Sequence, residues 1–470
     1  MPDTAAIPRL KRSMHGFGAL MITLSCLSPT IGVFVVGSDV IRQAGTATFA
    51  CFVAAALLGV AMASVYGELV SAFPETGAEY TILGRTMGPS WGFAMLGMNL
   101  SGFSIAQALS GLGVATYLQV IAPGLPAAPT AIALVVTVTA IAMLNIQINA
   151  LITGVFLAME IASLAVLGVL GFLHPHRAVA DVVLHPVMLG SSGGLVPTSL
   201  AVMGTAAAGA IYAFNGYGGV VSLGEEMHDA PRRVAGVIFW ALGLAAAFQL
   251  VPVLSVMVGA PDLKALMTAE APLPAFIQQV GGPWLAKAMS LGVALAVFNA
   301  MIAVSLMAGR QLYSTGRDGV WSGAVNRAFT QIHPRLGSPW VATLVMGGLS
   351  VAWCLAPLAI LVTIIACGTV GIYAALCLAV IAGRRNGSTA HAAYRMPFFP
   401  AAPVIALMAL AGVIWTSLTD AQTGRPGLLA TALVVVASAL YYQLVLRPRG
   451  TWGHRGPSEL DPELVTESAT

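Results

Sequence analysis

Apolar runs long enough to cross a lipid bilayer follow one another along almost the whole chain. They cover approximately residues 15–40, 46–72, 88–121, 127–145, 149–173, 197–224, 234–259, 283–309, 340–356, 358–382, 400–418 and 427–446. A helix needs about 20 apolar residues to cross the hydrocarbon core of a membrane. The pattern therefore predicts an all-α integral membrane protein with about 12 transmembrane helices, and residues 340–382 also allow a different division.

Two of these runs are interrupted near their centres by residues that disfavour a helix. Residues 28–32 (Ser-Pro-Thr-Ile-Gly) interrupt the first run, and residues 214–219 (Phe-Asn-Gly-Tyr-Gly-Gly) interrupt the sixth. Lipid offers no hydrogen bonds to a freed backbone group, so a break is stable only where it is buried in protein or lines a cavity. Paired breaks in two halves of a chain are typical of secondary transporters with a substrate site at the bilayer midplane.

Composition and charge support a membrane protein with a defined orientation. The chain is 58% hydrophobic and only 8% charged, whereas soluble domains carry about 25% charged residues. With a cytoplasmic N-terminus, 16 of the 21 Lys and Arg residues fall on inner segments, as expected for cytoplasmic loops. We therefore expect a multi-pass protein of the cell inner membrane with both termini in the cytoplasm. A division into eleven helices would weaken this asymmetry.

The chain is expected to form one membrane domain without a separate soluble domain. Residues 1–14 are predicted to be a cytoplasmic N-terminus, residues 15–446 the transmembrane domain, and residues 447–470 a polar cytoplasmic tail. Polar segments at 74–85 and 310–339 are placed inside, and those at 174–197 and 259–283 outside. Residues 311–329 are a candidate for a short amphipathic helix on the membrane surface.

Polar motifs follow the predicted inner ends of three helices. Residues 73–80 are Phe-Pro-Glu-Thr-Gly-Ala-Glu-Tyr, residues 224–233 are Gly-Glu-Glu-Met-His-Asp-Ala-Pro-Arg-Arg, and residues 309–319 are Gly-Arg-Gln-Leu-Tyr-Ser-Thr-Gly-Arg-Asp-Gly. In these motifs the chain resembles the amino acid–polyamine–organocation superfamily of permeases. The resemblance implies two inverted five-helix repeats of the leucine-transporter type, about 15–173 and 197–382, and two extra helices within about 400–446. It also places the substrate between discontinuous helices 1 and 6.

The two breaks offer backbone groups that can bind a small zwitterion. A half-helix that begins near Thr30 points free N–H groups into the cavity, where the helix dipole favours a substrate carboxylate. Carbonyls freed near Ser28 and Phe214 are candidates to hold an ammonium group, and Gly32 and Gly216 let a ligand approach the backbone. The alternative is that these glycines serve only close helix packing.

Side chains near the breaks complete the candidate substrate site. Aromatic faces can cover a bound ammonium group, and ordinary core packing is the alternative for each of them. The amide of Asn215 is costly to bury without partners, so we favour it as a ligand or as a group that stabilises the break. The candidate substrate-binding residues are Ser28, Thr30, Ile31, Gly32, Asn99, Tyr212, Ala213, Phe214, Asn215, Gly216, Tyr217 and Asn299.

Glu160 lies at the centre of the fifth predicted helix, with apolar neighbours on both sides. A carboxylate at that depth is costly and indicates a functional site. Desolvation favours its neutral, protonated form, so we predict that Glu160 couples transport to protons. In some transporters that the chain resembles, a lysine in this stretch lies where sodium binds in others. Sodium is therefore the alternative coupling ion, and a purely structural glutamate is the other alternative.

Glu68, Glu225, Glu226 and Arg310 lie near predicted inner helix ends. The hypothesis is an intracellular gate of charge pairs that open and close during alternating access, and plain anchoring at the membrane interface is the alternative. No cofactor or metal is expected, because the cysteines and histidines show no ligand spacing. A phosphate-binding glycine loop is also missing from the sequence, which argues against ATP-driven transport.

The sequence therefore predicts a secondary active permease, a symporter or antiporter, that moves an amino acid or related small amine by alternating access. Proton coupling is favoured over sodium, and an exchange mode stays open. A carrier of amines or polyamines without a carboxylate is the alternative within transport. A non-transporting amino acid sensor is the alternative of a different class, and an enzyme is not expected. The expected partners are the substrate, the coupling ion and membrane lipid, with no nucleic acid.

Overall fold

The structure is a computed structural model that describes residues 15–75, 77–144, 146–450 and 452–453. Within these ranges, the side chains of residues 146–155 and 222–226 are not described. The expectations for the N-terminal segment 1–14 and for most of the tail therefore lie outside the described residues.

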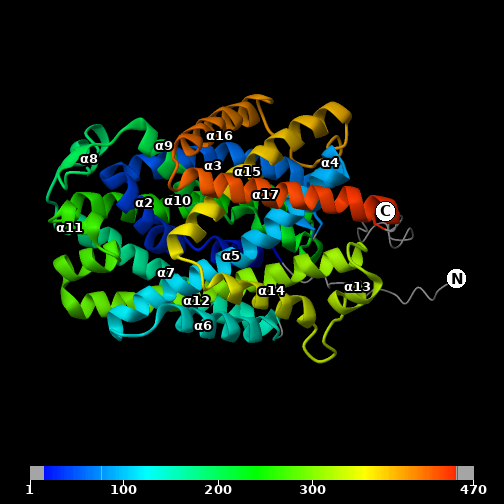
Figure 1. Cartoon of the computed structure of the whole chain (residues 1–470), viewed down its shortest axis with the longest axis horizontal. Helices are drawn as coiled ribbons and strands as arrows, with labels where there is room; N and C mark the ends of the chain where they lie inside the picture. Colours follow the sequence, from blue (N-terminus) through cyan, green and yellow to red (C-terminus); the bar gives the residue numbers. More distant parts are fainter. Residues whose placement is uncertain (1–14, 76, 145, 451, 454–470) are drawn as a thin grey trace.

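Long apolar helices run between two ends of the molecule (Figure 1). They are α3 (Thr48–Ala72), α5 (Pro89–Ile121), α6 (Ala127–Ala142), α7 (Ile146–Leu173), α10 (Ala230–Gly259), α12 (Pro272–Arg317), α14 (Trp340–Trp353), α15 (Leu358–Asn386), α16 (Ala401–Thr419) and α17 (Gly424–Tyr441). Among the described residues, 8 helical stretches are long and apolar enough to cross a membrane. The prediction of a helical membrane protein is confirmed at this level.

Short elements lie at the two ends of the bundle. The end that carries α4 (Ala78–Met87) and α13 (Gly323–Phe329) is called the terminal end here, because the described chain finishes there after η4 (Tyr442–Leu446) and α18 (Arg447–Arg449). The opposite, hairpin end carries α8 (Val179–Leu184), α11 (Leu263–Thr268) and an antiparallel hairpin of β1 (Val187–Leu189) and β2 (Leu195–Pro197). The sequence pattern did not predict this hairpin.

Several connecting segments contain more helix than the sequence pattern predicts. The polar segment 74–85 includes most of α4, and the segment 259–283 includes α11 and the start of α12. α12 is longer than the predicted range 283–309 and bends at Gly282, which has a φ of 82°. Because Gly282 leaves the helical conformation and Pro283 follows it, an apolar run that begins at Pro283 marks the bend rather than the helix start.

Two helices are interrupted at the places that the sequence indicates. α1 (Gly16–Leu27) ends where Ser28 adopts a left-handed conformation (φ 41°), and the chain continues through η1 (Ile31–Val36), α2 (Gly37–Ala44) and η2 (Gly45–Ala47). α9 (Leu200–Ala213) ends before Gly216 (φ 122°), and the 3₁₀-helix η3 (Tyr217–Glu226) follows. The breaks touch, because a Cβ atom on Gly216 would lie 2.5 Å from Cα of Leu27.

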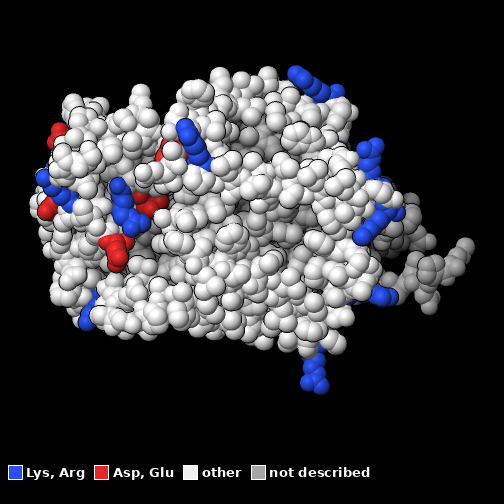
Figure 2. Space-filling view, viewed as in Figure 1, with Lys and Arg blue, Asp and Glu red and all other residues white. Residues whose placement is uncertain are grey.

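Charged side chains gather toward the two ends of the visible face (Figure 2). Only Lys and Arg are visible at the terminal end, whereas both signs of charge are visible toward the hairpin end, and a broad uncharged surface separates them. Large apolar side chains such as Trp240, Trp415 and Leu433 are exposed on the molecule. An uncharged surface with exposed apolar side chains is what contact with lipid requires, in agreement with a multi-pass membrane protein.

Small residues set the distance between α7 and α10. A Cβ atom on Gly171 would lie 2.1 Å from the carbonyl oxygen of Ser255, and the Ser255 hydroxyl donates to the carbonyl of Gly168 at 2.6 Å. Helices in membranes approach closely through such small residues. Because α7 carries Glu160, this contact helps to position that carboxylate.

We predict that Gly171→Ala destabilises the protein by about 1–3 kcal/mol, because the added methyl group must push α7 and α10 apart. Gly168→Ala is the matched control, since its Cβ atom would lie 3.4 Å from its nearest neighbour, Val251, which is an ordinary contact. Thermal unfolding of the purified protein in detergent measures both. Equal melting temperatures for the two variants would contradict the close approach.

Candidate substrate cavity

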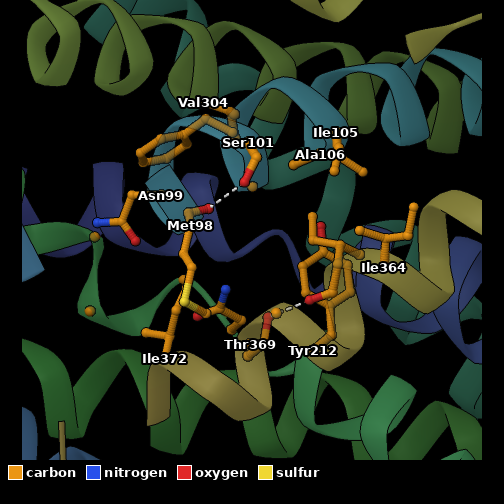
Figure 3. A pocket seen from close by; sticks show the side chains of 18 of the residues that line it. Met98, Asn99, Ser101, Ile105, Ala106, Tyr212, Val304, Ile364, Thr369 and Ile372 are labelled. Atoms are coloured by element: carbon orange, nitrogen blue, oxygen red, sulfur yellow. Dashed lines mark hydrogen bonds between the residues drawn. The ribbon is translucent and has the colours of Figure 1, made fainter. Parts of the chain in front are cut away.

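A cavity of about 210 Å³ lies beside both helix breaks. Residues of α5 and α15 form two opposite walls, and Figure 3 shows Ser101 and Ile105 of α5 across from Ile364 and Thr369 of α15. Residues of α1, η1 and the α9–η3 break also line it, and α3, α4, α12, α14 and α17 contribute single residues or short groups. The lining is mostly apolar, with a few polar groups, which is the usual character of a small-molecule site.

Glu160 closes the break in the first helix. Its Oε1 atom accepts hydrogen bonds from the Ser28 hydroxyl at 2.8 Å and from the Thr30 backbone N–H at 2.8 Å. Glu160 is 1% exposed, and its Oε2 atom has no hydrogen-bond partner among the described residues. The carboxylate therefore lies at the N-terminal end of η1, where the helix dipole favours a negative charge.

The backbone N–H groups of this break are bonded within the protein. Besides Thr30, the N–H of Ile31 donates to Oγ of Ser28 at 3.4 Å, and the N–H of Gly32 donates to the carbonyl of Ser28 at 3.2 Å. The sequence predicts free N–H groups here for a substrate carboxylate. The structure differs because the Glu160 carboxylate and the Ser28 oxygens already accept these hydrogen bonds.

The break between α9 and η3 is held by side chains from two other helices. Gln249 of α10 donates from Nε2 to the carbonyl of Ala213 at 3.0 Å, and the Tyr373 hydroxyl of α15 donates to Oδ1 of Asn215 at 3.4 Å. A Cβ atom on Gly32 would lie 2.8 Å from the Ala213 carbonyl oxygen. Only glycine at position 32 therefore lets the first break pack this closely against the second.

The structure brings part of the predicted substrate site together at the cavity. The predicted residues that line it are Ile31, Gly32, Asn99, Tyr212, Ala213, Asn215 and Gly216. Other predicted residues are buried and are not part of its lining: Ser28, Thr30, Phe214, Tyr217 and Asn299. In Figure 3, Asn99 and Tyr212 lie toward opposite ends of the cavity. The side-chain amide of Asn299 donates instead to the Ser25 hydroxyl at 2.9 Å.

Tyr66 and Glu79 also line the cavity, although neither was among the predicted substrate-binding residues. The Glu79 carboxylate accepts from the Tyr66 hydroxyl at 3.0 Å and from Nδ2 of Asn99 at 2.9 Å. Glu79 belongs to α4, a helix of 10 residues that is not among those long and apolar enough to cross a membrane. Burial raises the pKa of Glu79, and the hydrogen bonds from Tyr66 and Asn99 oppose that rise.

Three buried tyrosines pack together next to Glu79. The ring centroids of Tyr66 and Tyr217 are 5.8 Å apart, those of Tyr66 and Tyr373 are 6.2 Å apart, and those of Tyr217 and Tyr373 are 6.3 Å apart. A Cβ atom on Gly218 would lie 2.7 Å from the Tyr66 ring. The rings therefore leave no room for a side chain at position 218, and Tyr66 brings this aromatic cluster to the cavity wall.

The predicted gate residues are partly within the described structure. Glu68 is fully buried, and its carboxylate accepts from Nε and Nη2 of Arg384 at 2.6 Å each and from the Met396 N–H at 2.8 Å. Arg384 was not among the predicted gate residues. Arg310 lies near the end of α12, and the side chains of Glu225 and Glu226 lie outside the described residues.

No group of three or more His, Cys, Asp or Glu side chains in the described part of the chain is placed to hold a metal ion. The described residues that line the cavity offer one carboxyl group, several hydroxyl and amide groups and an apolar wall. Such a set can bind and orient a small organic molecule through hydrogen bonds and apolar contact.

Comparisons with known proteins point to one family. A family model described as amino acid permease matches residues 16–439. The chain is 25% identical to a branched-chain amino acid permease of Bacillus subtilis over 86% of this chain and 88% of that protein. It is 24% identical to a methylthioribose transporter of the same organism over 87% and 90%. It is also 22% identical to a low-affinity putrescine importer of Escherichia coli over 61% and 62%.

We predict that Arg384→Met destabilises the protein by about 2–4 kcal/mol, because it leaves the buried Glu68 carboxylate without its cation. The exposed neighbour Arg385 supplies the matched control, Arg385→Met. In thermal unfolding, only Arg384→Met should melt at a clearly lower temperature, and adding Glu68→Gln to it should recover part of the loss. If the two single variants have the same melting temperature, the ion pair does not stabilise the structure as described.

Proposed function

The chain belongs to the amino acid permease family, and we propose that it is a secondary active transporter that moves an amino acid or related small amine across the cytoplasmic membrane. The observation that carries this proposal is the cavity beside two touching helix breaks, one of them closed by the buried Glu160. In secondary transporters, interrupted helices typically form the substrate site around which the two halves of the protein move during alternating access.

The proposed architecture has twelve membrane crossings. Residues 15–173 and 197–382 form two inverted five-helix repeats, and residues 400–446 add two helices. The support is that the first helix of each proposed repeat is the one that breaks. Both termini are proposed to be cytoplasmic, since the terminal end shows only basic side chains on the visible face and basic residues favour the cytoplasmic side.

Proton coupling is proposed to take place at Glu160. Its Oε1 atom holds Ser28 and Thr30, while Oε2 is unpartnered in the described structure and is free to accept a proton without breaking either hydrogen bond. A buried carboxylate without a cation is costly, and protonation removes that cost. Glu160 takes up a proton from the side of higher proton concentration and releases it on the other side. The change of charge at the start of η1 favours one arrangement of the break over the other.

Two groups of side chains are proposed to close the cavity toward the terminal end. The aromatic cluster of Tyr66, Tyr217 and Tyr373 lies next to the cavity, and the Glu68–Arg384 pair joins α3 to α15 beyond it. Opening toward that end requires the pair to separate or to move as a unit. Glu225, Glu226 and Arg310 are proposed to belong to the same gate.

The relatives differ in the substrates that their names state: branched-chain amino acids, methylthioribose and putrescine. The proposed substrate class, an amino acid or small amine, includes two of these three substrates. A molecule of that class is also small enough for a cavity of about 210 Å³. Amino acid exchange and amine uptake are variants of the same transport cycle. A sensor that binds the same ligand without moving it is the competing function.

Uptake of labelled amino acids and amines into proteoliposomes tests the proposal. Wild-type protein should accumulate its substrate when an inward proton gradient is imposed. Glu160→Gln removes the titrating group but keeps a hydrogen-bonding side chain, so accumulation should lose its dependence on the pH gradient while the protein still folds. Glu270→Gln, at an exposed position near the hairpin end, is the control that should keep it.

Three results would revise the proposal. Unchanged pH dependence in Glu160→Gln would remove the coupling role from Glu160. Accumulation that follows a sodium gradient and ignores the proton gradient would assign coupling to sodium. Ligand binding without any flux into the vesicles would favour the sensor over the transporter.

A further inference from the structure

The charge of the cavity wall comes from one residue. Glu79 is the only Asp, Glu, Lys, Arg or His among the described residues that line the cavity. No cationic side chain in the described part of the chain lies within ion-pair distance of it, because its two partners are the neutral groups of Tyr66 and Asn99. The cavity wall therefore carries a carboxyl group that has no cationic partner among the described residues.

A carboxylate in that position is stabilised only in part. It can accept about four hydrogen bonds, and each of its oxygen atoms receives one from a neutral donor. Charged donors form hydrogen bonds to carboxylates that are roughly twice as strong as neutral ones. A ligand cation beside Glu79 would supply a positive charge. Its N–H groups would also donate hydrogen bonds to the acceptor positions of the carboxylate that Tyr66 and Asn99 leave unused.

The rest of the wall suits an apolar body attached to such a cation. Phe103 and Ile105 of α5, Trp353 of α14 and Ile365 of α15 line the cavity together with Met307 of α12. A methylene chain can lie along this surface, and aromatic rings near an ammonium group add attraction.

The first helix break offers little to a ligand carboxylate. The N–H groups of Thr30, Ile31 and Gly32 are bonded within the protein, and Glu160 already places a carboxylate at the start of η1. A second carboxylate there would compete with the first and would be repelled by its charge. The residues near the first helix break therefore favour a ligand that is recognised by its positive charge over a ligand that is recognised by its carboxylate.

We propose that Glu79 binds an ammonium group of the substrate, so that the substrate is a small organic cation with an aliphatic body, such as an α,ω-diamine or a basic amino acid. This inference rests on the proposed function, because it takes the cavity as the site of the transported molecule. It adds the class of substrate and a residue that selects it.

Binding to the purified protein in detergent, followed by thermal shift and calorimetry, tests the inference with three probes. L-lysine and L-norleucine share a backbone and a similar side chain and differ in the ε-ammonium group, while 1,5-diaminopentane carries two ammonium groups and no carboxylate. Wild-type protein should bind at least one of the two cations more tightly than norleucine, by a factor of about ten or more. This factor corresponds to the free energy of one charge-assisted hydrogen bond.

Variants at position 79 separate binding from structure. Glu79→Gln should lose the preference for the cation, and Glu79→Asp should keep it at lower affinity because it retains the charge. The control Glu270→Gln lies at an exposed site and should match wild type. If Glu79 only tied α3, α4 and α5 together, Glu79→Gln would lower the melting temperature and weaken all three probes by the same factor.

Other results distinguish failure of the inference from failure of the proposed function. Norleucine that binds and enters proteoliposomes as well as lysine would show a transporter that does not select for a side-chain cation. Failure of both cations to bind to wild-type protein would also overturn the inference. Binding of a cation that depends on Glu79, without uptake into proteoliposomes, would support the inference and contradict the proposed transport.

Discussion

The hydrogen bonds from Ser28 and Thr30 to Glu160 are the interaction on which the rest of this structure depends. A helix that stops inside a membrane leaves backbone groups without partners, and lipid cannot supply any. Here a carboxylate from α7 receives the Thr30 N–H and the Ser28 hydroxyl at 2.8 Å each, which closes the break from the side. The same carboxylate is then buried without a cation among the described residues. One group therefore stabilises the interruption, and the proposed function assigns the coupling proton to the same group.

Close packing turns the two breaks into a single site. Gly216 lies against Leu27, and Gly32 lies against the Ala213 carbonyl, so each break occupies space that a side chain on the other would fill. Gln249 and Tyr373 bind the second break from α10 and α15. Because these contacts join segments of both halves of the chain, a shift at one break would displace groups of the other break, and both breaks line the same cavity.

The positions of the breaks could be predicted because proline and clustered glycines interrupt apolar runs, and Glu160 was evident as a carboxyl group among apolar neighbours. What it bonds could not be predicted, since Glu160 and Ser28 are 132 residues apart and their contact depends on how α7 packs against α1. Glu79 was missed for a related reason: it belongs to a motif placed in an inner loop, whereas α4 brings it to the cavity wall. The β1–β2 hairpin and the first turns of α12 lie in polar segments with weak periodicity.

Infrared difference spectroscopy of the purified protein tests the central claim most directly, because the stretching band of a protonated carboxyl group reports its charge and hydrogen bonding. A change from high to low pH should produce a protonated carboxyl band that is missing from the spectrum of Glu160→Gln, and addition of substrate should alter that band. A wild-type spectrum identical to that of Glu160→Gln would mean that the group closing the first helix does not titrate, which would contradict the account.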